Sequence, residues 1–94
     1  MNAVVVNLVG YGSRQISQTA TSLWDCEVCK KIQRMVVNGA FMAIELGDGA
    51  VENPMKNAGA NCVIIFAGID DRRWYVKETV DEIANAMDNT RVVK

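Results

Sequence analysis

The fold depends on one ambiguous segment, residues 22–39, which reads SLWDCEVCKKIQRMVVNG. Its first residues include Ser22 and Asp25, which form a Ser-x-x-Asp pattern typical of a helix start. Apolar side chains then recur at helical spacing, at Trp24, Val28, Ile32, Met35 and Val36. This spacing favours a helix over the middle of the segment, residues 25–37.

The end of the segment, Asn38-Gly39, fits two structures. It is a suitable C-cap for the helix. It is equally suitable as a type I′ turn that joins one strand over 31–37 to another over 40–46. The helix is favoured because it gathers positive charge near its C-terminal end, where the helix dipole makes cations stabilising. These charges belong to Lys30, Lys31 and Arg34.

Strand character appears on both sides of this segment. Residues 3–9 are rich in β-branched side chains and predict a buried strand, which Gly10-Tyr11-Gly12 closes as a tight turn. Residues 14–21 are rich in Ser, Thr and Gln, as expected of an exposed strand or an extended arm. Residues 40–46 alternate between inward and outward positions and predict a strand with one solvated face.

The C-terminal part predicts a hairpin followed by a helix. Residues 62–67 are apolar on both faces, which is typical of a central strand, and 72–76 return as its partner after a turn. Thr79 and Glu82 form a capping box that predicts a short final helix. We therefore predict a single α+β domain over residues 1–94, with a small antiparallel or mixed sheet, a middle helix and a short C-terminal helix.

Residues 47–61 contain three Gly, three Asn and the only Pro of the chain, so they predict a long loop. Loops of this length are often functional in compact domains. Its few charges and its apolar side chains indicate an intermolecular arm. Together with two aromatic residues of the predicted strand 72–76, the candidate intermolecular contacts are Val51, Pro54, Met55, Trp74 and Tyr75.

The composition excludes several classes of function. Ten Lys and Arg against eleven Asp and Glu give a net charge of −1, which excludes a nucleic-acid clamp that acts by bulk charge. The chain has no His, which removes the commonest general base and the commonest metal ligand. No base, nucleophile and orienting group can be assembled, so we predict a protein that is not an enzyme and uses no cofactor or small-molecule substrate.

The cysteines and the N-terminus bear on location. No basic stretch followed by a long apolar core opens the chain, so no secretory signal is expected. The longest apolar runs fall far short of the roughly 20 residues that cross a bilayer. Three cysteines are an odd number, which favours free thiols in a reducing compartment. We expect a cytoplasmic or virion protein.

The pair Cys26-Glu27-Val28-Cys29 resembles a redox or zinc motif in spacing alone. About sixteen residues separate it from the first strand, whereas the thioredoxin-like Cys pair follows a strand directly. Cys62 supplies only one further thiolate and no His completes a tetrahedral zinc set. We therefore predict no metal site and structural cysteines, with a redox role of Cys26 and Cys29 left open.

Parts of the chain are similar to the small ring-forming bacterial matrix-gene regulators. The similarity lies in the opening strand with Gly10-Tyr11-Gly12, the middle helix ending at Gly39, and the closing hairpin with residues 77–80. It covers roughly two thirds of the chain. The arginine-rich DNA-binding segment of those regulators has no counterpart here, because the matching residues are Gly47-Asp48-Gly49. The resemblance therefore implies a ring-forming subunit without that DNA contact.

Two functions follow from these patterns. The favoured one is a non-enzymatic structural subunit of a homo-oligomeric assembly, with a small virion protein as its specific form and copies of itself or other particle subunits as partners. The alternative is a small oligomeric regulator that binds DNA or a protein partner. Its nucleic-acid contacts would be Arg14, Lys30, Lys31, Arg34, Arg72 and Arg73.

Overall fold

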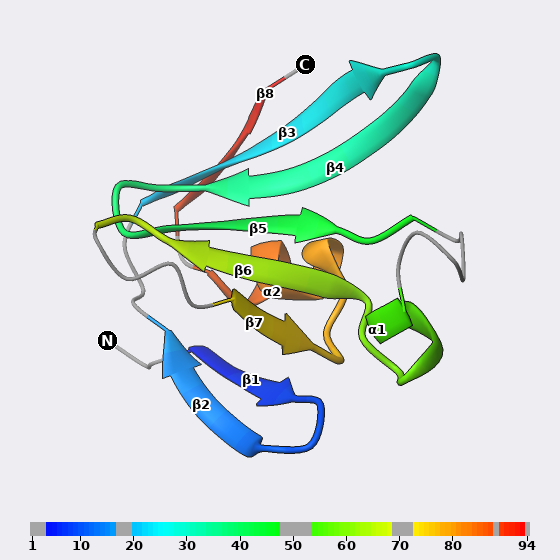
Figure 1. Ribbon diagram of the computed structural model, residues 1–94. Helices are drawn as coiled ribbons and strands as arrows, with labels where there is room; N and C mark the ends of the chain where they lie inside the picture. Colours follow the sequence, from blue (N-terminus) through cyan, green and yellow to red (C-terminus); the bar gives the residue numbers. More distant parts are fainter. Residues whose placement is uncertain (1–3, 17–19, 48–53, 69–72, 88, 94) are drawn as a thin grey trace.

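One mixed sheet of eight strands, in the order β2-β1-β7-β6-β5-β4-β3-β8, organises the protein (Figure 1). The computed structural model describes residues 4–16, 20–47, 54–68, 73–87 and 89–93. The strands are β1 (Val4–Leu8), β2 (Gly12–Ile16), β3 (Thr21–Val28), β4 (Lys31–Val37), β5 (Phe41–Glu45), β6 (Cys62–Phe66), β7 (Arg73–Val76) and β8 (Thr90–Val93). The helices are α1 (Pro54–Asn57) and α2 (Val80–Ala86). Neighbouring strands are antiparallel except β3 and β8, which are parallel.

The expected helix over 25–37 is wrong, because this segment forms the β3–β4 hairpin. Its turn consists of Cys29 (φ 50°) and Lys30 (φ 66°), both in the left-handed region that two-residue hairpin turns require. Apolar side chains lie on both faces of the hairpin, and a sequence with this property also satisfies a helical spacing over a short window. Asp25, which suggested a helix start, instead pairs with Arg34 across the hairpin, with 2.7 Å between Oδ1 and Nε.

Asn38-Gly39 joins β4 to β5, as the alternative interpretation of this turn predicted. The turn is closed by the Asn38 side chain, whose Oδ1 accepts hydrogen bonds from the amides of Ala40 (2.7 Å) and Phe41 (2.8 Å). Gly39 does not adopt a positive φ, so the turn is not type I′. The side chain of Asn38, rather than the freedom of Gly39, shapes the connection.

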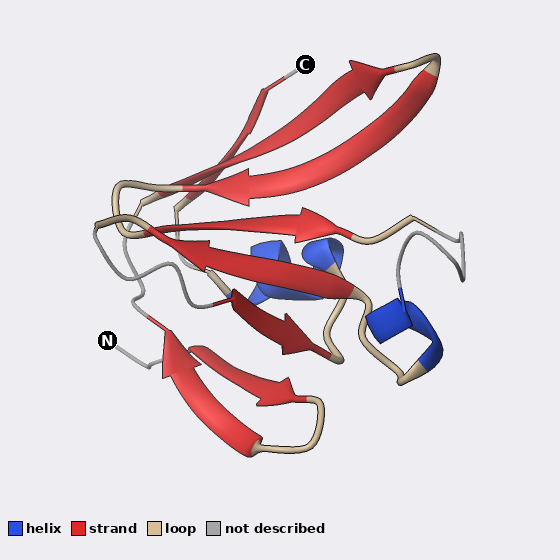
Figure 2. Cartoon of the chain, viewed as in Figure 1, coloured by secondary structure: helices blue, strands red, loops and turns tan. Residues whose placement is uncertain are grey.

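The fold is therefore mostly β-sheet, and the predicted α+β class, with a small sheet and a middle helix, is wrong (Figure 2). The short C-terminal helix is confirmed as α2. Its capping box is formed as expected: the Glu82 amide donates to Thr79 Oγ1 at 3.1 Å, and the Thr79 amide donates to Glu82 Oε1 at 3.2 Å. An eighth strand, β8, was not expected from the sequence.

The hydrophobic core lies on one face of the sheet, between the strands and α2, which passes behind the sheet in Figure 1. Alternation along each strand sends every second side chain to this face. Arg34 reinforces the packing, since its guanidinium pairs with both Asp25 of β3 and Asp81 of α2. The buried core residues are Val4, Val6, Leu8, Ile16, Leu23, Val36, Phe41, Ala43, Cys62, Ile64, Val76, Val80, Ile83, Ala84 and Met87.

Candidate functional site

The second face of the sheet carries a continuous row of large side chains. Strand register places five residues side by side across β3, β4, β5, β6 and β7: Trp24, Met35, Ile44, Val63 and Tyr75. A neighbouring row contains Val37, Met42, Ile65 and Arg73. We call this surface, the side of the sheet opposite α2, the open face.

Within the described part of the chain, no helix packs over the centre of the open face. Figure 2 shows α2 behind the sheet and α1 at one end of it. Most of the apolar side chains on the open face are half-buried by their neighbours in the sheet, but Trp24 is 39% exposed and Val5 of β1 is 50% exposed. A contiguous apolar surface of this kind is unusual on a protein that acts alone, and commonly marks an interaction site.

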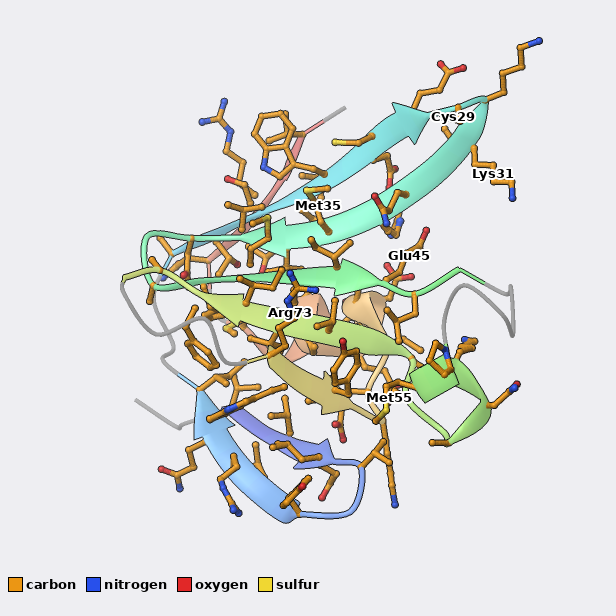
Figure 3. The ribbon with its side chains drawn as sticks, viewed as in Figure 1. Cys29, Lys31, Met35, Glu45, Met55 and Arg73 are labelled. Carbon is orange, nitrogen blue, oxygen red and sulfur yellow. The ribbon has the colours of Figure 1, made fainter. Side chains whose placement is uncertain are left out.

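A groove of about 510 Å³ crosses the open face between β4, β7 and α1. Figure 3 looks onto this face and shows Arg73 over the strands, Lys31 near the hairpin tip and Met55 at the end toward α1. Residues that line the groove are Lys31, Gln33, Ile44, Glu45, Leu46, Gly47, Pro54, Met55, Val63, Ile65, Arg73 and Tyr75.

The groove exists because β4 and β5 separate. Their described pairing is confined to Met35–Val37 and Met42–Ile44, after which the β3–β4 hairpin projects away from β5 (Figure 1). Beyond this point, hydrogen bonds that involve side chains connect β4 and β5 in place of backbone pairing. Glu45 Oε1 accepts from the Arg34 amide at 2.9 Å, and Gln33 Nε2 donates to the Glu45 carbonyl at 3.4 Å. The two strands therefore stay connected at one end and open at the other.

The opposite wall of the groove comes from α1. This single helical turn is held against the chain that follows it, since the amide of Ala60 donates to the Met55 carbonyl at 3.0 Å. Lys56 Nζ also donates to Asn61 Oδ1 at 2.9 Å, and the Asn61 amide donates to the Val76 carbonyl at 2.8 Å. These bonds fix Met55 beside β6 and β7.

The charged side chains that the described strands place on the open face are all positive. By strand alternation its charged residues are Lys31, Arg73 and Arg91, and among the described strand residues none on this face is Asp or Glu. Glu45 lines the groove from the edge of β5, but one of its oxygens is bound to the Arg34 amide. The groove therefore combines apolar walls with cations that have no ion pair within the described residues.

The structure brings together three of the five predicted intermolecular contacts. Pro54, Met55 and Tyr75 all line the groove. Trp74 points to the other face, where its ring packs edge-on against Phe66 at a centroid distance of 4.6 Å. Val51 lies outside the described residues. Of the predicted arm 47–61, the part from Pro54 onward is bound to its own chain.

The predicted nucleic-acid contacts do not gather on one surface of the described chain. Arg34 is committed to Asp25 and Asp81 on the α2 side. Lys30 and Lys31 lie at the tip of the β3–β4 hairpin, while Arg14 lies on β2 at the far edge of the sheet, where it donates to the Ser13 carbonyl. Arg73 lies on the open face, and Arg72 is outside the described residues.

The three cysteines are free thiols, and they differ in solvent exposure. Cys29 is exposed at the hairpin turn, Cys26 is half-buried on β3, and Cys62 is fully buried in the core. Burial raises the pKa of the Cys62 thiol to about 12, with a smaller contribution from the charge of Glu78. In the described residues, no group of three or more His, Cys, Asp or Glu side chains is placed to hold a metal ion.

The described residues also contain no helix long and apolar enough to cross a membrane. The two sheet edges, β2 and β8, are each paired on one side only in the described chain. Unpaired edges offer backbone donors and acceptors to another strand. The two edges are therefore a second candidate interaction surface.

Sequence reasoning missed the residues that make the open face continuous. Trp24 and Met35 were assigned to the apolar stripe of a helix, although they are cross-strand neighbours. The available signal was the central strand 62–67, which is apolar on both faces. A strand of that kind requires a covering layer on each side, and the two predicted helices accounted for both layers until the middle one proved to be a hairpin.

Comparison with protein-family models, with curated proteins and with solved structures finds no match for this chain. The function proposed below therefore rests on the geometry and chemistry of the open face.

Proposed function

We propose that the protein is a non-enzymatic subunit of a homo-oligomeric assembly, and that the open face is the surface through which its copies bind each other. The observation that carries this proposal is the apolar row from Trp24 to Tyr75, which no helix of the described residues covers. A virion shell is one form of such an assembly, and the copy number distinguishes it from a dimer.

Two features of the described chain support self-association. The apolar side chains of the open face form one contiguous patch, and burying such side chains contributes about 1.5–3 kcal/mol each before ordering costs are subtracted. Most of this face is strand, so its backbone is already ordered and binding loses little further conformational entropy.

The test substitutes a residue of the row with lysine. Met35→Lys adds a charge to the middle of the open face, where a partner copy would bury it, so it should lower the mass of the assembly measured by light scattering. The matched control is Ile32→Lys, which adds the same charge to the same strand on the opposite face, where the side chain is 63% exposed. Circular dichroism verifies that both variants keep the fold.

The proposal fails if Met35→Lys assembles like the parent while remaining folded. It also fails if both lysine variants lower the mass equally, because the effect would then be one of charge and not of the open face. Should Met35→Lys unfold, Met42→Lys on β5 repeats the test on the neighbouring row.

A further inference from the structure

We propose that the groove binds a small amphipathic carboxylate, a molecule of the chemical class of a medium-chain fatty acid. The carboxylate lies at Arg73, and the apolar chain lies along the floor of the groove toward α1. This inference goes beyond the proposed function and does not depend on self-assembly, because every residue that it uses belongs to one chain.

The groove has the size and the lining of a small-molecule site. Its volume of about 510 Å³ is within the range of roughly 300–1,000 Å³ that is usual for such sites. Strands β4, β5, β6 and β7 contribute to it together with α1. Most of the side chains that line it are apolar, and a few polar groups are placed among them, as is typical of ligand pockets.

The floor of the groove suits an apolar chain. Ile44 of β5 lies opposite Val63 of β6, and Val63 lies opposite Tyr75 of β7, so the three side chains form a continuous strip across the sheet. Val63 is only 9% exposed, whereas Met55 of α1 is half-buried at the end of the groove (Figure 3). An alkyl chain on this strip removes apolar surface of both partners from water.

Arg73 is the group that selects an anion. It lies opposite Ile65 on the open face, lines the groove and is exposed, and it forms no ion pair within the described residues. A guanidinium binds a carboxylate through two parallel N–H···O hydrogen bonds, which fixes the orientation of the ligand. Tyr75 is two residues along the same strand and lines the same groove, so its hydroxyl is a further donor near this end.

The distribution of charge determines which way the ligand lies. Among the described residues that line the groove, only Glu45 is acidic. It lies toward the hairpin end together with Lys31, so the two charges at that end cancel (Figure 3). Register places Arg73 level with Met42, which precedes Glu45 by three residues, or about 10 Å along the strand. The unbalanced positive charge is therefore at the Arg73 end, and the carboxylate belongs there.

Other amphiphiles fit the groove less well. A neutral head group covers Arg73 without supplying an opposite charge, so the guanidinium loses water and gains no ion pair. A cationic head group adds electrostatic repulsion from Arg73 to this loss. Charge complementarity therefore favours an anionic ligand over a neutral or cationic one with the same apolar chain.

The experiment compares three ligands that share a chain of ten carbons and differ in charge. Decanoate, 1-decanol and decylammonium are titrated into the full chain by isothermal titration calorimetry, each below the concentration at which it aggregates. Decanoate should saturate at one molecule per chain. Its dissociation constant should be at least tenfold lower than that of decylammonium, with 1-decanol between the two.

Substitution of Arg73 tests the charge in the groove. Arg73→Gln should raise the dissociation constant of decanoate at least tenfold and leave that of 1-decanol nearly unchanged. The matched control is Arg91→Gln, which removes the same charge from the same face, but on the edge strand β8 and outside the groove. This control should bind decanoate like the parent.

Met55→Ser tests the apolar end of the groove. Because Met55 lies away from Arg73, this variant should weaken decanoate and 1-decanol by a similar factor. Circular dichroism verifies that all three variants keep the fold.

Several outcomes would overturn the inference. These are equal affinity for the three ligands, uptake of decanoate without saturation, and equal effects of Arg73→Gln and Arg91→Gln. A folded Arg73→Gln variant that binds decanoate like the parent overturns it as well. Light scattering on the same samples keeps the two proposals apart. A parent that is monomeric at every concentration but binds decanoate contradicts the proposed function alone, and a parent that assembles but binds no decanoate contradicts this inference alone.

Discussion

At the scale of single residues, burial of Cys62 links stability to pH. The folded state raises the pKa of its thiol from 9.0 to about 12, because the buried thiolate loses its hydration. The unfolded chain therefore releases this proton at lower pH than the folded chain. Stability from this residue is complete below pH 9 and is lost as the pH rises toward 12.

We expect the free energy of unfolding of the parent to fall more steeply above pH 9 than that of Cys62→Ala, by up to about 1.4 kcal/mol per pH unit. Urea titrations at pH 7, 9 and 10.5 measure this difference. The variant is less stable at every pH because it leaves a cavity, so the slopes are compared and not the absolute values. Parallel slopes for the two proteins would contradict a buried neutral thiol.

The three thiols also predict a reaction order. Cys29 is exposed, Cys26 is half-buried and Cys62 is buried, so a thiol reagent should modify them in that order in the native protein. In denaturant, without prior reduction, the titre should be three equivalents. A titre of one equivalent would mean that two cysteines form a disulfide, and would reopen a redox role for Cys26 and Cys29.

At the scale of elements, Thr79 determines where α2 begins. Its hydroxyl accepts from the Glu82 amide and its own amide donates to the Glu82 carboxylate, so both bonds depend on the helix start being placed at this residue. Thr79→Ala should lower the free energy of unfolding by about 1 kcal/mol in chemical denaturation. Thr79→Ser keeps the acceptor and should lose much less, whereas equal losses from both variants would contradict the cap.

Elements that carry a local signal were predictable. The strands β1, β5, β6 and β7 fall within the predicted ranges 3–9, 40–46, 62–67 and 72–76, and the cap at Thr79 is the predicted one. The β3–β4 hairpin was not predictable in this way. Its turn places Cys29 and Lys30 in left-handed conformations, and neither residue type is a usual sequence signal for such a turn. The strand β8 was missed because it depends on parallel pairing of Thr90 with the distant Thr21.

The candidate site, like the fold, was predictable only in part. Pro54, Met55 and Tyr75 were named because loop and strand-end residues stand out in sequence, and all three line the groove. Trp24 and Met35 were assigned to a helix, since the error in 25–37 moved them to the wrong element. A row that crosses five strands is defined by register, and register is a long-range property that no single segment contains.

At the scale of the whole molecule, the described residues form two layers, one of sheet and one of helix, and none of their helices covers the centre of the outer sheet face. Sheets with apolar side chains on both faces are stable when both faces are covered. Under the proposed function, two copies joined at their open faces would form a helix–sheet–sheet–helix arrangement in which both faces of each sheet are covered. On this proposal, the second copy supplies the covering layer that the described residues of one chain do not place on the open face.

The mass of the unmodified protein in solution tests this account most directly. One chain has a mass of 10.3 kDa. Size-exclusion chromatography with light scattering, across a range of micromolar concentrations, should give a mass of at least twice this value, falling toward it only on dilution. A mass of one chain at every concentration, with the fold intact by circular dichroism, would contradict the claim that the open face binds a second copy.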